Sequence, residues 1–378
     1  MNPKRLGPLI IIVVIVIFLP LTVLAEEQSI ERQQLEQWIT KLFDERAHML
    51  VHSTDDNLEE YYLTSEAAAR GAFRQEKLRK VYIQTWANKR FLSLTDAESR
   101  IRLVRVKISG NHARVSLVQS LKLSYAYNGK PEQPQHFGIG TRHVLNLQRN
   151  DGVWKVAREY YLDPLTENPK LIPELAPAEE GIPFIRSDGV SLSVPKSGAR
   201  RYQRERAVSY ANKYAGLAWG AGNNNRYNQK YRDYTDLGGD CTNFASQVLG
   251  DPEEGGGLKM THGWRYRFKA GGSESWVRTD SFKHFLLYSG YGTVVARGTF
   301  DAVVKKTDKH PNGAFSKIQP GDLIAYEMDG DVDHFSVVVG FDVYGYPLVN
   351  SHTADRYQVP FDLGWDKYTK YWLIHIKD

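Results

Sequence analysis

The stretch Gly238-Gly-Asp-Cys-Thr-Asn-Phe-Ala-Ser-Gln-Val-Leu-Gly250 surrounds Cys241, the single cysteine of the chain. Apolar residues after the cysteine recur near one face of a helix, and Gly250 is suited to end that helix. The pattern therefore predicts that Cys241 lies in the first turn of a short buried helix. Because unpaired N–H groups at a helix N-terminus stabilise a thiolate, this cysteine is the candidate nucleophile.

A thiol nucleophile needs a base, and His334 is the candidate because it begins an apolar strand predicted over 334–341. A third polar group should orient its imidazole. His352 is the first choice and Asn350 the second, since they lie two residues apart on the next predicted strand and face one side. The register of this hairpin decides whether His334 faces the same side, and the turn around Gly345 leaves the register open.

Four further residues are candidates for substrate binding. Asp240 precedes the nucleophile, and its charge raises the thiol pKa unless the carboxylate caps the helix. The hydroxyl of Tyr227 is a candidate donor to a developing oxyanion. Trp264 and Trp276 are candidates to line a groove, although aromatic residues more often fill a core.

Each of these residues also has a structural interpretation. A buried, inert cysteine behaves as a small apolar residue, and a histidine on a strand is often a hydrogen-bonded core residue. The segment Asp329-Gly-Asp-Val-Asp333 resembles the start of a calcium loop, but it lacks the glycine at the sixth position and the closing glutamate. The histidines show no zinc-binding spacing. We therefore expect no metal and no cofactor.

The region before residue 166 predicts helices followed by strands. Apolar residues first recur at helical spacing and then alternate with polar residues, which indicates an α+β fold with an antiparallel sheet. This order resembles the cone-shaped fold of the NTF2-like superfamily. Prolines then punctuate 166–199, which predicts a linker. The predicted helices cover 30–43, 58–62 and 73–91, and the predicted strands cover 101–108, 113–127, 138–147 and 154–161.

Residues 1–25 have the layout of a secretory signal peptide. Two basic residues precede an apolar run from Leu9 to Leu24, which ends on small residues before Glu26. An uncleaved anchor is the alternative, because the run approaches the length of a membrane span. Both interpretations place the protein outside the cytoplasm, either secreted or held at the membrane or cell wall.

The composition is that of a globular protein with room for two domains. Of the 378 residues, 42% are apolar and 25% are charged, which excludes a disordered chain. The formal net charge of +5 comes from basic residues scattered among acidic ones. Because no basic cluster stands out, we expect no nucleic-acid partner.

Several segments together resemble an amidase domain family of Gram-positive bacteria: 238–247, Gly321-Asp322 before a predicted strand, Asp333-His334 and 351–355. That family is similar to the NlpC/P60 and CHAP cysteine hydrolases, whose papain-like fold places Cys on a helix and His on a sheet. The resemblance covers 201–377 and implies amide or peptide bond hydrolysis by a Cys241–His334 pair. Residues 219–234 and those after Gly250 depart from the family pattern, which leaves the substrate cleft undefined.

We therefore predict a leader (1–25), an NTF2-like domain (26–165), a linker (166–199) and an amidase-like cysteine hydrolase domain (200–378). The predicted function is an exported amidase that acts on cell-wall peptides through a thioester. Its expected partner is peptidoglycan or another amide substrate, with membrane association if the leader stays attached. The alternative is a non-catalytic cell-surface binding protein with a degenerate amidase domain.

Overall fold

The computed structural model describes residues 9–52, 57–165, 167–175 and 201–378, and it describes side chains from residue 29 onward except that of residue 132. The side chains of the predicted leader and the predicted linker from residue 176 to 199 therefore lie outside the described residues. Among the helices whose side chains are described, none combines the length and the apolar character needed to cross a membrane.

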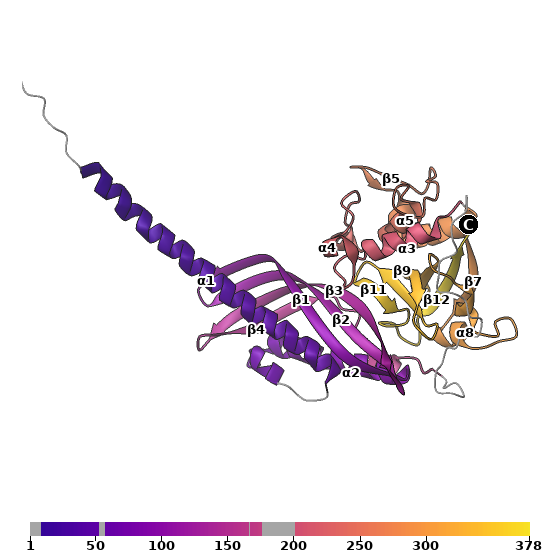
Figure 1. Ribbon diagram of the computed structural model, residues 1–378, viewed down its shortest axis with the longest axis horizontal. Helices are drawn as coiled ribbons and strands as arrows, with labels where there is room; N and C mark the ends of the chain where they lie inside the picture. The colour runs from indigo at the N-terminus through magenta and orange to yellow at the C-terminus, as the bar shows by residue number, and fades with distance from the viewer. Residues whose placement is uncertain (1–8, 53–56, 166, 176–200) are drawn as a thin grey trace, which may run out of the picture.

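The N-terminal region packs helices against an antiparallel sheet (Figure 1). Its elements are α1 (Leu9–Val51), η1 (Asn57–Tyr61), α2 (Ala67–Lys89), β1 (Leu92–Ser109), β2 (His112–Tyr127), β3 (Lys130–Asn150) and β4 (Val153–Tyr161). The end of α1 nearest the sheet lies against β1, and α2 contacts both β1 and β4. The apolar side of α2, including Tyr82 and Trp86, meets Leu121 and Leu123 of β2 in a buried core. Burial of these alternating strand residues holds the helices on one face of the sheet.

The C-terminal region places helices on both faces of a second set of strands. Phe244, Trp264 and Phe335 belong to the core on one face, where three helices pack on a central strand, and Tyr326 belongs to the core on the opposite face. The central strand is β9 (Asp331–Phe341), and the three helices are α3 (Arg204–Lys213), α5 (Cys241–Gly250) and α7 (Thr279–Tyr288). The elements are η2 (Pro169–Leu171), α3 (Arg204–Lys213), α4 (Gly222–Asn225), η3 (Thr235–Leu237), α5 (Cys241–Gly250), β5 (Tyr266–Arg267), β6 (Gly271–Gly272), α6 (Glu274–Val277), α7 (Thr279–Tyr288), β7 (Gly292–Gly298), α8 (Phe300–Val304), η4 (Ala314–Lys317), β8 (Leu323–Met328), β9 (Asp331–Phe341), β10 (Pro347–Ser351), β11 (Asp355–Pro360) and β12 (Lys370–Ile376).

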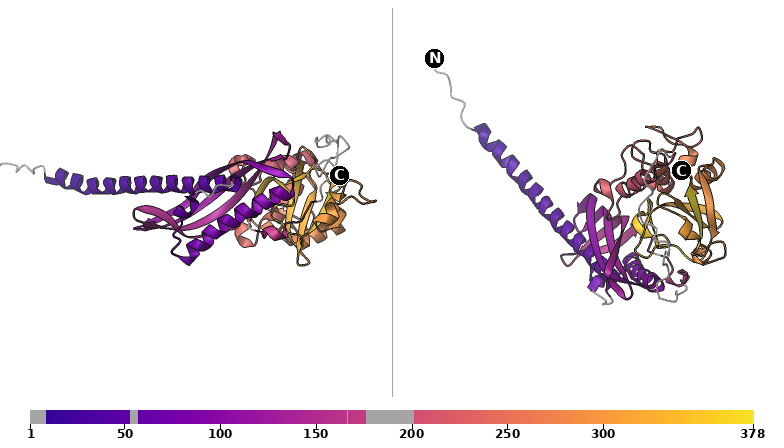
Figure 2. Two further views of the ribbon diagram at one scale, coloured as in Figure 1. Left: turned by 90° about the horizontal axis from the view of Figure 1, so that it is seen from below. Right: turned by 45° about the vertical axis from the view of Figure 1, so that its right-hand side comes forward.

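The strands of the two regions join in one antiparallel sheet with the order β1-β2-β3-β11-β10-β9-β8-β12-β7. The junction is the pairing of β3 with β11, in which Gly140 lies opposite Asp355 and Gly138 opposite Tyr357. β4 pairs with a later part of β3, from His143 onward. The magenta and yellow strands consequently lie side by side in both Figure 1 and Figure 2.

Two glycines in β3 explain how the regions come so close together. A Cβ atom at Gly138 would lie 1.9 Å from the carbonyl oxygen of Trp219, and one at Gly140 would lie 2.5 Å from the backbone nitrogen of Ala218. A glycine inside a strand often marks such a close approach of another backbone. The segment 217–219 of the C-terminal region therefore rests directly on the N-terminal sheet.

The residues that open the predicted linker also pack against the protein. Ile172 and Leu175 are buried in two different apolar cores, and the carbonyl oxygen of Pro173 accepts a hydrogen bond from Arg90. The backbone N–H of Lys367 donates to the carbonyl of Leu171. This segment is thus held by contacts from both regions as far as residue 175.

The predicted α+β class is confirmed. The predicted strands of the N-terminal region correspond to β1–β4, which extend beyond the predicted bounds, and Cys241 begins a short buried helix as predicted. Neither β7 nor β11 was predicted from the sequence. The sequence of β11, Asp355-Arg-Tyr-Gln-Val-Pro360, lacks a clear alternation because adjacent residues, which point to opposite faces, are buried at both of its ends.

Candidate functional site

Cys241 is the first residue of α5, and every residue of this helix is buried. Gly238 and Gly239 precede it with φ angles of 111° and 123°, values that residues other than glycine rarely adopt. These glycines let the chain turn sharply into the helix. Cys241 keeps 7% of its surface exposed, so the thiol lies at the edge of the core.

The sulfur of Cys241 lies beside the strand that carries the candidate base. The backbone N–H of Phe335, the residue after His334 on β9, donates to it, and the Thr242 hydroxyl lies 3.8 Å away. Burial raises the pKa of the Cys241 thiol and the charge of Asp240 adds to this, while hydrogen bonds from Phe335 and Thr242 act in the opposite direction. The resting thiol is therefore protonated at neutral pH, and its reaction requires a base.

His334, the residue before Phe335 on β9, has a neutral imidazole. Burial lowers its pKa well below 6.5, and the charges of Arg356 and His352 lower it further. The ring packs near Tyr326 and Trp365, with centroid distances of 5.7 Å and 5.5 Å. Its Nε2 atom is buried and makes no hydrogen bond to the described part of the chain. A neutral ring is the form that can accept a proton.

No hydrogen bond joins the Cys241 thiol to the His334 imidazole among the described residues. The sulfur approaches β9 from the side of α5, whereas the His334 ring packs with Tyr326 and Trp365, which belong to the core on the opposite face. Hydrogen bonds between catalytic groups are often long in free enzymes and tighten with substrate. The structure thus brings the two residues to neighbouring positions without joining their side chains.

The two candidate orienting residues lie on the other side of the sheet from the His334 ring. In the β9–β10 ladder, Asn350 is opposite Val337. The Asn350 amide donates to Asn212 on α3, and its carbonyl oxygen accepts from the backbone of Gln358. The ring of His352 stacks on Phe244 of α5. The hairpin register therefore corrects the expectation that His352 or Asn350 holds the imidazole of His334.

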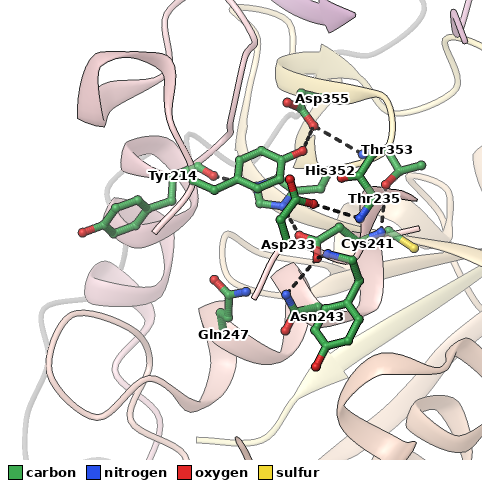
Figure 3. Close-up of polar contacts among 12 residues, drawn as sticks. Tyr214, Asp233, Thr235, Cys241, Asn243, Gln247, His352, Thr353 and Asp355 are labelled. Carbon is green, nitrogen blue, oxygen red and sulfur yellow. Dashed lines mark hydrogen bonds and ion pairs between the residues drawn. The ribbon is translucent and has the colours of Figure 1, made fainter. Parts of the chain in front are cut away.

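His352 instead binds Asp240, the residue that precedes the candidate nucleophile, and Figure 3 shows His352 with its other partner, Tyr214. Its Nδ1 lies 2.5 Å from a carboxylate oxygen of Asp240, and its Nε2 lies 2.7 Å from the carbonyl oxygen of Tyr214. Because neither partner can donate a proton, both ring nitrogens must carry one. His352 is therefore a buried imidazolium that neutralises Asp240.

The pKa of His352 agrees with this assignment. Burial alone lowers the pKa of the imidazole, but the hydrogen bond to Asp240 and the charges of Asp240 and Asp355 raise it above its ordinary value of 6.5. The ring is held from both faces, by Tyr227 at a centroid distance of 3.9 Å and by Phe244 at 4.0 Å. Both its charge and its position are thus fixed by contacts within the protein.

Asp240 occupies the N-cap position of α5, but its side chain does not cap the helix. One carboxylate oxygen accepts hydrogen bonds from the backbone N–H of Tyr234 and from Asn243, while the other binds His352. The backbone N–H of Asp240 donates to the hydroxyl of Thr353. Asp240 is 1% exposed, and its contacts fix the entry of the chain into α5.

The three aromatic candidates for substrate binding already have partners inside the protein. The Tyr227 hydroxyl donates to Asp355 over 2.6 Å, which leaves it no proton for an oxyanion. Trp264 and Trp276 are fully buried, and their indole N–H groups donate to Ser246 and Asn243. This burial corrects the expectation that the two indoles line a groove, since neither has exposed surface.

Arg142 of the N-terminal region also reaches this site, and it was not predicted from the sequence. Its guanidinium lies over the ring of Tyr227, with its central carbon 5.2 Å from the centroid, and within 4.0 Å of Asp355. The signal that could have indicated this contact is the pair Gly138 and Gly140 inside a predicted strand, just before Arg142.

Metal binding finds no support in the part of the chain that the structure describes. No group of three or more His, Cys, Asp or Glu residues there could hold a metal ion. His352 and Asp240, which could have served as zinc ligands, are hydrogen-bonded to each other.

A curated protein is similar in sequence to part of this chain. It is 32% identical over 168 residues to the uncharacterized protein YhbB of Bacillus subtilis (strain 168), a match that covers 42% of this chain and 43% of that protein. The chain thus spans less than half the length of this relative.

Solved structures also match this chain at low similarity, and two of them are as follows. One is the intermembrane space region of the chloroplast protein ARC6, which is 12% identical with a TM-score of 0.19. The match covers 32% of this chain and 95% of the ARC6 chain. A de novo designed β-sheet protein is 19% identical, covers 25% of this chain and 84% of its own, and has a TM-score of 0.10. Both TM-scores are too low to indicate a shared fold.

A family model matches the region that contains the candidate site. The matched residues are 201–374, and the family is described as "Putative amidase domain". The match includes Cys241, His334 and the Asp240–His352 pair. It confirms the resemblance expected for this region and suggests an amidase-type hydrolase.

Proposed function

We propose that the C-terminal region is a cysteine-dependent amide hydrolase in which Cys241 is the nucleophile and His334 is the base. The observation that carries the proposal is the position of the sulfur. It lies at the N-terminus of α5 and accepts the N–H of Phe335, directly after His334. The thiol pKa is raised and the imidazole is neutral, so their protonation states suit proton transfer, which requires the His334 ring to turn from the opposite face of β9 toward the sulfur when substrate binds.

The proposed reaction is acyl transfer through a thioester. His334 takes the thiol proton as the sulfur of Cys241 attacks the amide carbonyl, and it returns that proton to the nitrogen as the amine leaves. Water then attacks the thioester carbonyl with His334 again as base, which releases the carboxylic acid and restores the thiol. The Cys241 backbone N–H, at the start of α5, is the proposed donor to the oxyanion.

We further propose that the enzyme acts outside the cytoplasm on cell-wall peptides. Support comes from the layout of residues 1–25 and from the resemblance to an amidase family that is similar to the NlpC/P60 and CHAP cysteine hydrolases. The N-terminal region, which we propose to be an NTF2-like domain, joins the hydrolase through the shared sheet. We also propose a papain-like arrangement for the C-terminal region, and the support for it is a cysteine on a helix that packs against a sheet.

The test compares turnover of peptidoglycan fragments by the wild-type protein and by Cys241→Ala. We expect the variant to lose turnover, and intact-mass measurement of the wild-type protein mixed with muropeptides should detect an acyl adduct on Cys241. Iodoacetamide should abolish activity, while chelation with EDTA should leave it. Equal turnover by the two proteins would remove the enzyme proposal in favour of a binding protein.

A further inference from the structure

We propose that Arg142, on β3 of the N-terminal region, is a positioning residue of the cysteine site in the C-terminal region. This inference rests on the proposed function, because it assigns Arg142 a role in presenting Cys241. The consequence is that the two regions form one catalytic unit, in which the N-terminal sheet supplies part of the support for the nucleophile.

The β3–β11 pairing places Arg142 at the junction of the two regions. Gly140 lies opposite Asp355 in this ladder, and Arg142 follows two residues later on the same face of β3. Its guanidinium approaches Asp355 at 4.0 Å and Asp233 at 3.5 Å, and it covers the ring of Tyr227. Every one of these partners belongs to the C-terminal region, so the side chain acts across the junction.

Charged side chains of alternating sign lie between Arg142 and Asp240, the residue before the proposed nucleophile. Asp355 is fully buried and accepts hydrogen bonds from the Tyr227 hydroxyl and from the backbone N–H of Leu217. The Tyr227 ring stacks on the His352 imidazolium, at an interplanar angle of 6°. His352 then binds Asp240. The order is guanidinium, carboxylate, imidazolium and carboxylate, so each charge has a neighbour of opposite sign.

This order explains why the effect of Arg142 should reach the thiol. Asp355 helps to keep His352 protonated, and protonated His352 neutralises Asp240 beside Cys241. Without Arg142, the buried carboxylate of Asp355 loses a partner and the Tyr227 ring loses the cation that covers its outer face. The His352–Asp240 pair and the start of α5 would then be held less firmly, which lowers the reactivity of the sulfur without touching substrate.

The experiment uses the full chain and two substitutions of the same kind. Arg142→Gln removes the charge at the junction, and Arg114→Gln removes an exposed charge from β2 as the matched control. We expect Arg142→Gln to lower kcat about tenfold, within the range of coupling through intermediate residues, with little change in KM. The rate at which iodoacetamide alkylates Cys241 at neutral pH should fall in parallel. Arg142→Lys, which keeps the positive charge, should restore most of both.

These readouts separate positioning from stability alone. A residue that only joins the two regions would lower the melting temperature and leave kcat per folded molecule and the alkylation rate unchanged. The inference is overturned if Arg142→Gln matches Arg114→Gln in turnover and alkylation. The proposed function has a separate failure, namely equal turnover by the wild-type protein and Cys241→Ala, and the alkylation rates do not depend on that result.

Discussion

His334 on β9 and His352, directly after β10, are both buried between aromatic rings, yet their hydrogen bonds and their charges differ. His352 has hydrogen bonds at both ring nitrogens, aromatic rings on both faces and a carboxylate partner. The Nε2 of His334 is buried without a hydrogen bond in the described chain, and its pKa is lowered where that of His352 is raised. A ring with both nitrogens hydrogen-bonded supports structure, whereas a neutral ring without a hydrogen bond at Nε2 is suited to accept a proton.

The largest effect should come from the ring that we assign to catalysis. Replacing His334 by Gln removes the base, and we expect kcat to fall by about a factor of a thousand, within the range for a lost general base. Stability should change far less, because Nε2 makes no hydrogen bond that the variant could lose. Steady-state kinetics and thermal unfolding of the same preparation measure both. Retained turnover would show that another group takes the thiol proton.

The equivalent substitution His352→Gln should have the opposite effect, with a large loss of stability and a small loss of turnover. It leaves the buried Asp240 carboxylate without a cation, and breaking such a pair costs about 3 kcal/mol or more of unfolding free energy. Urea unfolding measures this loss. We expect turnover per folded molecule to fall much less than in His334→Gln. If His352→Gln instead kept full stability and lost turnover a thousandfold, the two roles would have to be exchanged.

The pKa shifts of the two histidines predict opposite pH dependences of stability. The folded pKa of His334 is lowered, so the unfolded state binds more protons below pH 6.5 and stability falls as the pH drops through that range. The folded pKa of His352 is raised, so its contribution is present below 6.5 and is lost as the pH rises through the folded value. A tenfold difference in proton affinity between the folded and unfolded states corresponds to about 1.4 kcal/mol of unfolding free energy.

We therefore expect the unfolding free energy to pass through a maximum near neutral pH, measured by urea titrations across the range. His352→Gln should flatten the alkaline side of this profile, and His334→Gln should flatten the acidic side. An alkaline side that is unchanged in His352→Gln would show that the ring is not charged in the folded protein.

The sequence was sufficient to predict the α5 helix, the strand that begins near His334 and the α+β class, because each depends on local spacing. It was insufficient to decide which way β10 faces. A shift of one residue reverses every side chain of a strand, and the irregularity between Leu348 and Val349 in the β9–β10 ladder has no signal in the residues. His352 and Asn350 were consequently assigned to the wrong neighbour.

The partners of Asp240 and Arg142 lie far from them in the sequence, which is why local patterns could not reveal them. Asp240 meets His352 only after the chain has passed through β7, β8, β9 and β10, and Arg142 meets Asp355 only through the β3–β11 pairing. Trp264 and Trp276 illustrate the same limit, since the sequence does not distinguish an aromatic residue that lines a groove from one that fills a core.

The smallest expected effect on turnover and stability comes from Tyr227, whose ring stacks on His352. Tyr227→Phe keeps the ring and removes the hydroxyl that donates to Asp355, so we expect a loss of about 1 kcal/mol in unfolding free energy and a small loss of turnover. A residue that donated to the oxyanion would lower kcat by about a hundredfold or more on losing its hydroxyl. The size of the kcat change therefore decides between the two roles, and Tyr214→Phe, which removes a hydroxyl that donates to Glu254, is the matched control.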